Sequence, residues 1–319
     1  MGHRVDVTRG TGNLVPMRVS RVLASAVLLA CGGSRDGSPI APTPAATPQP
    51  AAACFPTTST GTAPLRDPNG PFFHQVAIAR TTNGTTVTEA RTVIDHGSVP
   101  DGVRRRNGEV LIYYVNGASG GATWVARLSG DSVQAIGPIT LNGVSAPTGV
   151  VDPDAVLLPN GRVRLAFYGG FGPTPNDQQR AMCIAESDDG VVFTSLGAAL
   201  TFSLTEPLTD PSQLALGDGT WLMAISRGQQ TIIARSDDGV VYTRESTLAF
   251  GGVPELALTP DGAVRLYVCA GGIVSYRSTD AGRTWRREGT VIDAGFGGRP
   301  IVCDPSLVAG AEWFVFKSG

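Results

Sequence analysis

A repeat with a period of about 50 residues constrains the fold of this chain more than any other feature. In four places a polar residue preceded by proline stands six residues before an Asn-Gly or Asp-Gly pair. These positions are Asp101, Asp154, Ser212 and Glu255, and a fifth unit starts around Ser306. They are separated by 53, 58, 43 and 51 residues. This period is typical of propeller blades, in which each repeat buries its apolar faces against its neighbours.

Each unit has the pattern of four antiparallel strands. In residues 151–194, Asn160-Gly161 joins two alternating apolar runs, and Asp188-Asp189-Gly190 turns a third run into a fourth. Asn-Gly and Asp-Gly pairs favour the left-handed backbone of tight hairpins. No stretch of comparable length has helical periodicity, which disfavours stacked helix pairs. The sequence therefore predicts an all-β fold, a five-bladed β-propeller of four-stranded antiparallel blades.

The two ends of the repeat region complement one another. Residues 79–84 are similar to residues 234–239, and residues 92–95 repeat residues 290–293. The N-terminal strands therefore match the outer half of a blade whose inner strands lie near the C-terminus. We expect them to close the last blade, because closure removes the exposed sheet edges of an open array.

Composition excludes several classes of function. The chain of 319 residues has a net charge of −2, so no basic surface for nucleic acid is predicted. Its basic residues are nearly all arginine, and Lys317 is its single lysine. With 42% hydrophobic residues, 41 Gly and 23 Pro, it suits a turn-rich exported β-domain. His74 and His96 are the only histidines of the repeat region, too few for a histidine-based metal site. We expect no metal and no cofactor.

Residues 1–31 have the pattern of an export signal. Their apolar run, residues 22–30, is too short to span a bilayer as a helix. It ends in LLACG at residues 28–32, which resembles the lipobox of bacterial lipoproteins. The resemblance implies that Cys31 is lipidated and becomes the first mature residue, with Met17 as an alternative start. We expect an exported protein anchored by lipid to the cell envelope, at the bacterial outer membrane or cell surface.

A tether is predicted between the signal and the folded domain. Residues 32–71 are rich in Pro, Ala and Thr, a composition that buries little apolar area and favours an extended chain. The predicted propeller domain spans residues 72–319.

Four further cysteines suit an oxidising compartment. Cys269 ends a strand of the fourth unit and Cys303 begins a strand of the fifth on the same face, so a disulfide between them is predicted. Buried free thiols are the alternative. Pairing of Cys54 with Cys183 follows by elimination only.

Three units carry a shared signature in their second hairpin. Residues 187–194, 236–243 and 278–285 each contain a serine, an aspartate, a glycine and then an aromatic residue. These turns resemble the Asp-box, or BNR, repeat of sialidases and many other propellers. The resemblance implies structural turns, in which Ser and Asp oxygens accept backbone N–H groups and Gly supplies positive φ. A calcium loop would need further spaced oxygen ligands and a bidentate glutamate, which are missing.

Polar groups of all five units are expected to converge at one end of the channel, where the inner strands of a propeller begin. Grouped carboxylates shift one another's pKa and can share acid and base roles across a glycosidic bond. The alternative is that acids beside proline accept backbone amides at strand starts. The residues in register are Asp101, Asp154, Ser212, Glu255 and Ser306, with Asp152, Asp210 and Asp304 two residues upstream.

These acids are similar to those of five-bladed glycoside hydrolases of the arabinanase and fructosidase type. The resemblance implies a base at Asp101, a pKa modulator at Asp154 and an acid at Glu255 or Glu206. Sialidase activity itself is not expected, because sialidases use six blades, an arginine triad and an R-I-P motif that is scrambled here. The predicted substrate-binding residues are Asp152, Asp210, Ser212, Asp304, Ser306, Tyr168 and Arg299.

Two functions follow as hypotheses. The first is an exported, lipid-anchored, monomeric propeller that binds a glycan at the channel end and could hydrolyse it. The second is a non-catalytic surface module that binds glycan or protein. Two carboxylates about 5 to 10 Å apart, the spacing found in glycoside hydrolases, that face an open pocket would favour the enzyme. Carboxylates bonded to backbone amides would favour the scaffold.

Overall fold

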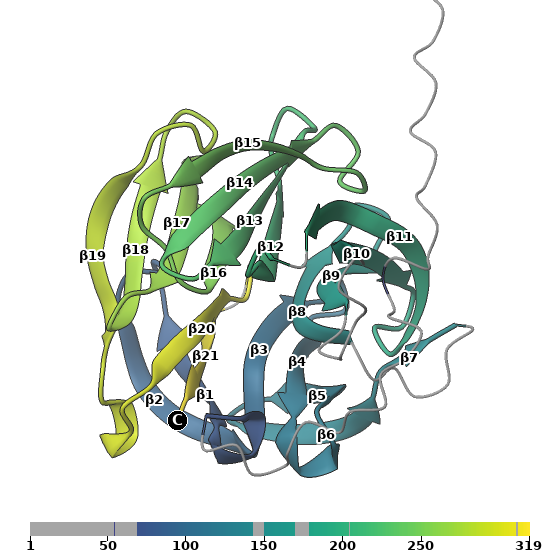
Figure 1. The fold of residues 1–319 in the computed structure, drawn as a ribbon. Helices are drawn as coiled ribbons and strands as arrows, with labels where there is room; N and C mark the ends of the chain where they lie inside the picture. The colour runs from purple at the N-terminus through teal and green to yellow at the C-terminus, as the bar shows by residue number, and fades with distance from the viewer. Residues whose placement is uncertain (1–53, 55–68, 143–149, 170–178, 204, 311) are drawn as a thin grey trace, which may run out of the picture. The chain divides into compact units, whose positions relative to one another are not determined.

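The computed structural model describes residue 54 and residues 69–142, 150–169, 179–203, 205–310 and 312–319. In this part of the chain, five antiparallel sheets surround a central channel as the blades of a propeller (Figure 1). The predicted signal segment, Cys31 and most of the tether lie outside the described residues. Where the structure describes the chain, it contains no helix with the length and apolar character needed to cross a membrane.

The all-β, five-bladed prediction is confirmed, and the strands of each blade follow one another from the channel outwards in blades 1 to 4. Blade 1 contains β3 (Gly97–Arg104), β4 (Val110–Asn116), β5 (Ala122–Ser129) and β6 (Ser132–Pro138). Blade 2 contains β8 (Val150–Leu157), β9 (Val163–Gly169), β10 (Gln179–Ser187) and β11 (Val192–Ser203), with the short β7 (Thr140–Leu141) added in parallel to β11. Blade 3 contains β12 (Thr209–Ala215), β13 (Trp221–Arg227), β14 (Gln230–Ser236) and β15 (Thr243–Leu248). Blade 4 contains β16 (Pro254–Leu258), β17 (Val264–Cys269), β18 (Gly272–Ser278) and β19 (Arg286–Asp293).

Blade 5 joins the two ends of the domain, as the internal similarity predicted. Its strand order is β2-β1-β21-β20, from outside to inside. The outer strands β1 (Gln75–Thr81) and β2 (Val87–Asp95) are N-terminal, and the inner strands β20 (Val302–Leu307) and β21 (Trp313–Ser318) are C-terminal. Figure 1 shows the blue β1 beside the yellow β21. The ring therefore closes by hydrogen bonds within a sheet.

The core consists of one apolar cluster between each pair of neighbouring blades. Strand β13 shows why, since alternate side chains of a strand point to opposite faces. Trp221, Met223 and Ile225 pack against blade 2, whereas Leu222 and Ala224 pack against blade 4. A strand buried on both faces has a continuous apolar run. This accounts for the uninterrupted hydrophobic stretches that accompany each predicted turn.

The three acidic turns link neighbouring blades. In blade 2, Ser187 Oγ accepts the Gly190 N–H at 2.8 Å, and Asp189 Oδ1 accepts the N–H groups of Val191 and Val192. Gly190 has φ +79°, which favours glycine at this position. The Tyr113 hydroxyl of blade 1 donates to the Gly190 carbonyl at 2.8 Å. In each turn the serine and aspartate side chains accept the backbone N–H groups of the turn, and a backbone carbonyl accepts a hydrogen bond from the preceding blade. The role of these turns is therefore structural.

A disulfide joins Cys54 to Cys183, with the Cα atoms 5.9 Å apart. Cys183 lies on β10 within the core cluster between blades 1 and 2. The bond therefore attaches the chain ahead of the propeller to the interior of blade 2.

Candidate functional site

Five side chains form a closed ring of hydrogen bonds around the channel. Each residue of this channel ring accepts the backbone N–H that follows the equivalent residue of the next blade. Asp101 accepts from Ala155 at 2.6 Å, and Asp154 accepts from Gln213 at 3.0 Å. The other bonds run from Leu256 N–H to Ser212 (2.9 Å), from Leu307 N–H to Glu255 (3.2 Å) and from Gly102 N–H to Ser306 (3.0 Å).

The three carboxyl groups of the ring are close together and buried. Single oxygens of Asp101, Asp154 and Glu255 all lie within 4.8 Å of one another. Burial raises the pKa of Asp101 to about 7, although Ser306 and two backbone N–H groups oppose the shift. Burial and then the neighbouring Asp101 raise the pKa of Asp154 and of Glu255 well above the usual range. Protons therefore stay on part of this cluster at neutral pH.

A second layer of aspartates lies towards the start of the inner strands. Asp152, Asp210 and Asp304 have φ of +51°, +49° and +49°, and the strand register shifts at each of these positions. Asp tolerates a positive φ better than most residues, because its short polar side chain can form local hydrogen bonds. The Asp-Pro pairs therefore form bulges that turn these carboxylates towards the channel end, a geometry that the sequence pattern did not predict.

Lys317 neutralises part of this outer acidic layer. Its ammonium lies 2.6 Å from Asp304 Oδ2, and both side chains are largely buried. Burial alone would lower the pKa of Lys317, but Asp304, Asp210 and Asp152 outweigh it and raise that pKa. Burial, followed by the charge of Asp304, raises the pKa of Asp210 to about 6. The single lysine of the chain is thus a buried counter-ion.

The channel end beside these aspartates leaves little room for a substrate. The depression there has a volume of about 20 Å³, space for one water molecule rather than a sugar ring. Its lining consists of the ring and outer-layer carboxyls together with Val99, Val253 and the prolines Pro100, Pro153, Pro211, Pro254 and Pro305.

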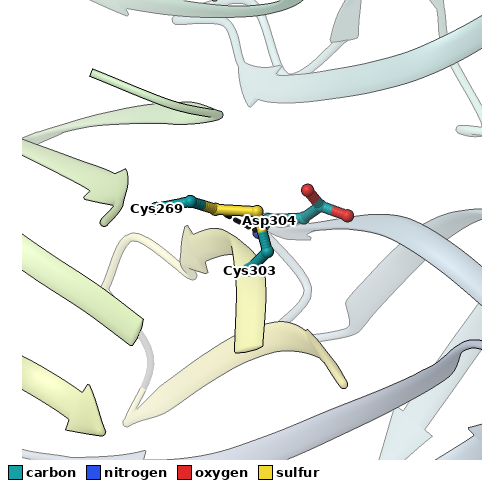
Figure 2. Close-up of side chains that lie close together, drawn as sticks. All are labelled: Cys269, Cys303 and Asp304. Carbon is teal, nitrogen blue, oxygen red and sulfur yellow. Dashed lines mark hydrogen bonds between the residues drawn. A yellow bond between two sulfur atoms is a disulfide. The ribbon is translucent and has the colours of Figure 1, made fainter. Parts of the chain in front are cut away.

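A disulfide lies at the edge of this channel end. Cys269 of β17 and Cys303 of β20 are bonded, with their Cα atoms 5.1 Å apart. In Figure 2 the Asp304 carboxylate points away from the sulfur atoms, while its backbone N–H donates to Cys269 Sγ at 3.2 Å. The bond joins blade 4 to blade 5 immediately beside the residue that pairs with Lys317.

Three predicted site residues lie away from the ring. Glu206 accepts two bonds from Arg244, at 2.8 and 2.7 Å, and these lower its pKa, the opposite of what a general acid needs. Tyr168 is buried between blades 2 and 3 and stacks on Phe202. Arg299 donates to the Phe73 carbonyl at 3.0 Å rather than to a ring residue. Of the two acids considered, only Glu255 belongs to the ring.

Two residues that sequence reasoning did not select lie at the channel. Lys317 stood out in the sequence as the single lysine of an arginine-rich chain, but nothing there linked it to the channel. Gln213 follows Ser212 and is 1% exposed, with its Nε2 donating to the Asp154 carbonyl. Nothing in the sequence pattern distinguishes Gln213 from other strand residues.

Comparison with known proteins supports the fold. No family model and no curated sequence matches the chain. A protein of unknown function from Dyadobacter fermentans DSM 18053 is 16% identical, with a TM-score of 0.52 over 79% of this chain and 85% of that chain. A fructofuranosidase from Schwanniomyces occidentalis, solved with fructose, is 14% identical, with a TM-score of 0.52 over 68% of this chain and 50% of that chain.

A third solved structure has a lower similarity score. An α-L-arabinanase from Penicillium chrysogenum, solved with arabinobiose, is 16% identical, with a TM-score of 0.48 over 76% of this chain and 79% of that chain. At these identities the likeness concerns the fold, and the named activities are those of the other proteins.

Proposed function

We propose that this protein is an exported, lipid-anchored propeller that binds a glycan around the channel end where the inner strands begin, without hydrolysing it through the channel ring. One observation carries the proposal: the candidate catalytic carboxyls Asp101, Asp154 and Glu255 each accept a backbone N–H from the next blade. Their role is therefore to join blades. At this end of the channel, the depression of about 20 Å³ further argues against a sugar at bonding distance.

The glycan assignment is supported by the fold and by the chemistry of this channel end. The fructofuranosidase of similar fold was solved with fructose, so the scaffold is compatible with sugar ligands. The backbone carbonyls and N–H groups of the loops between blades offer hydrogen-bond partners of the kind sugars use. A glycan would bind across the surface of this end rather than inside the channel.

Hydrolysis is the second candidate function. The observation that favours it is the group of three carboxyl oxygens within 4.8 Å, in which the pKa of Asp101 is raised to about 7. A raised carboxyl pKa is a property of general acids in glycosidases. The carboxyls are buried and bonded to the backbone, and two of them, Asp154 and Glu255, also line the cavity at the other end of the channel, so catalysis would require a sugar to reach them from that side.

One experiment separates the two candidates. A glycan array and a panel of chromogenic glycosides are tested with the wild-type protein, with Asp154→Asn, and with Asp218→Asn as a matched control in an exposed turn. We expect glycan binding by all three proteins and turnover by none. Turnover by the wild type that is lost in Asp154→Asn and kept in Asp218→Asn would establish the hydrolase. Absence of any bound glycan on the array would contradict the binding proposal.

The anchor is tested separately. If Cys31 carries the lipid, Cys31→Ser should move the protein from the membrane fraction to the soluble exported fraction. Fractionation followed by mass analysis of the N-terminus measures this. Membrane retention that the substitution leaves unchanged would contradict the lipid anchor.

A further inference from the structure

The opposite end of the channel contains a much larger cavity. Its volume is about 690 Å³, within the range of small-molecule sites. The cavity lies where the inner strands end, and Asp154 and Glu255 of the channel ring form part of its floor. The channel ring thus separates this cavity from the depression at the other end.

The walls of the cavity are mainly aliphatic. Val156, Leu214, Leu307 and Val308 come from inner strands or the turns that follow them. Leu258, at the end of β16, is 45% exposed and is one of few large apolar side chains on the described surface with such exposure. An apolar body bound here would remove this surface from water, which favours binding.

Gln213, a residue of the floor, has a buried acceptor without a donor. Gln213 Nε2 donates to the Asp154 carbonyl at 3.3 Å, which fixes the orientation of the amide. Its Oε1 is buried, and among the described residues no donor lies within hydrogen-bond distance of it. A buried acceptor of this kind is costly to leave unpaired.

The charges around the cavity favour a cation on the floor. The polar side chains of the floor are the amide of Gln213 and the carboxyls of Asp154 and Glu255, and the rest of the lining adds Thr81, Thr82, Asn83, Arg104 and Arg265. The arginines of the lining are committed elsewhere: Arg265 pairs with Glu288 at 2.6 Å, and Arg104 donates to the Gly310 carbonyl. A ligand that brings N–H donors and a positive charge would complement this floor.

We propose that this cavity is a binding site for an amphiphilic amine, whose ammonium group meets Gln213 Oε1 and the carboxyls of Asp154 and Glu255 and whose apolar body packs on the aliphatic walls. The site is independent of the glycan proposal, since it lies on the other side of the channel ring. Because burial keeps these carboxyls partly protonated, binding of an ammonium ion should release protons to the solvent.

The test uses three probes of one size: n-hexylamine, n-hexanol and n-hexanoate. Calorimetric titration of the full chain should show hexylamine binding at least about tenfold more tightly than hexanol, and no binding of hexanoate. Repeating the titration in buffers of different ionisation enthalpy should reveal proton release with the amine only. Equal affinity for amine and alcohol, or failure of all three probes to bind, would overturn the proposal.

Variants locate the site. Asp154→Asn keeps an acceptor for the Gln213 N–H but removes the charge, so it should weaken hexylamine binding about tenfold and leave hexanol binding unchanged. Leu258→Asn should weaken both probes, whereas Ile136→Asn, at an exposed apolar residue of β6 outside the cavity, should weaken neither. Circular dichroism and melting curves establish that each variant folds. Amine binding that none of the cavity variants changes would place the amine elsewhere and overturn the proposal.

Discussion

Ser306 Oγ of the last blade accepts the backbone N–H of Gly102 in the first blade at 3.0 Å, 204 residues away in the sequence. This bond completes the channel ring that Asp101, Asp154, Ser212 and Glu255 begin. Propeller closure therefore has two components: the shared sheet of blade 5 and this ring of side-chain bonds at the channel.

Loss of the closing bond should be measurable on its own. Ser306→Ala leaves the Gly102 N–H buried without its acceptor, which should lower the free energy of unfolding by about 1–3 kcal/mol. Urea denaturation measures the change. Ser132→Ala serves as the control, because that exposed hydroxyl donates only to the nearby Ser129 carbonyl. Equal stability of the two variants would show that the ring contributes nothing to closure.

Stability should decrease as pH rises through neutrality. The pKa of Asp101 is 3.8 in the unfolded chain and about 7 in the fold, so between these values the folded state holds more protons. Its contribution is complete below about pH 4 and is lost as pH rises through about 7. Melting temperature should therefore fall by several degrees from pH 5 to pH 9.

Substitution of Asp101 tests whether this residue causes the fall in melting temperature between pH 5 and pH 9. Asp101→Asn still offers an oxygen to the Ala155 N–H but does not titrate, so the fall in melting temperature should be smaller. Asp218→Asn should leave it unchanged, because hydrogen bonds from Thr220 lower the pKa of that exposed carboxyl. A pH profile identical in wild type and Asp101→Asn would refute the assignment.

Removal of Lys317 should destabilise the propeller strongly. Lys317→Met leaves Asp304 buried without its cation, and breaking a buried pair costs about 3–5 kcal/mol. The double variant Lys317→Met/Asp304→Asn should recover a substantial part of that loss, since Asn keeps an acceptor for the Val99 N–H. Urea unfolding of the wild type, Lys317→Met, Asp304→Asn and the double variant gives the coupling energy between the two residues. Additive effects would mean that the two residues do not interact.

The two disulfides should contribute unequally. Chain-entropy arithmetic gives about 4 kcal/mol for Cys269–Cys303, whose cysteines are 34 residues apart, and about 5 kcal/mol for Cys54–Cys183, 129 apart. Paired Cys→Ala variants and thermal unfolding with and without reductant test this. A reductant that leaves the wild-type melting temperature unchanged would indicate that neither bond stabilises the fold.

The N-terminal strands should be indispensable. A chain that begins near Val99 lacks β1 and β2, so β21 loses its partner and exposes a sheet edge, a loss comparable to the 5–15 kcal/mol net stability of a typical domain. We expect no cooperative melting. Full-length Cys54→Ala/Cys183→Ala controls for the disulfide lost with the deletion. Cooperative melting of the truncated chain at the temperature of this control would contradict closure through blade 5.

The repeat architecture could be predicted because its causes are local. Asn-Gly and Asp-Gly turns, strands with apolar residues on both faces, and the serine and aspartate of the acidic turns act over a few residues, so their spacing is visible in the sequence. Closure was also predictable, because residues 79–84 are similar to residues 234–239. The register of Asp101, Asp154, Ser212, Glu255 and Ser306 was likewise visible from their distance to each turn.

The chemical role of these residues was decided only by the tertiary structure. Whether a carboxyl faces a substrate or a backbone N–H depends on how close the next blade comes, a distance that no local pattern specifies. Glu255 and Glu206 illustrate this difference. Glu255 lies close enough to the next blade to accept its backbone N–H, whereas Glu206 pairs with Arg244. The roles of Lys317 and Gln213 likewise depend on contacts made in the fold: Lys317 pairs with Asp304, and the Gln213 N–H donates to Asp154. Sequence periodicity therefore determined the scaffold, while burial and inter-blade packing determined which of its polar groups remain available to a ligand.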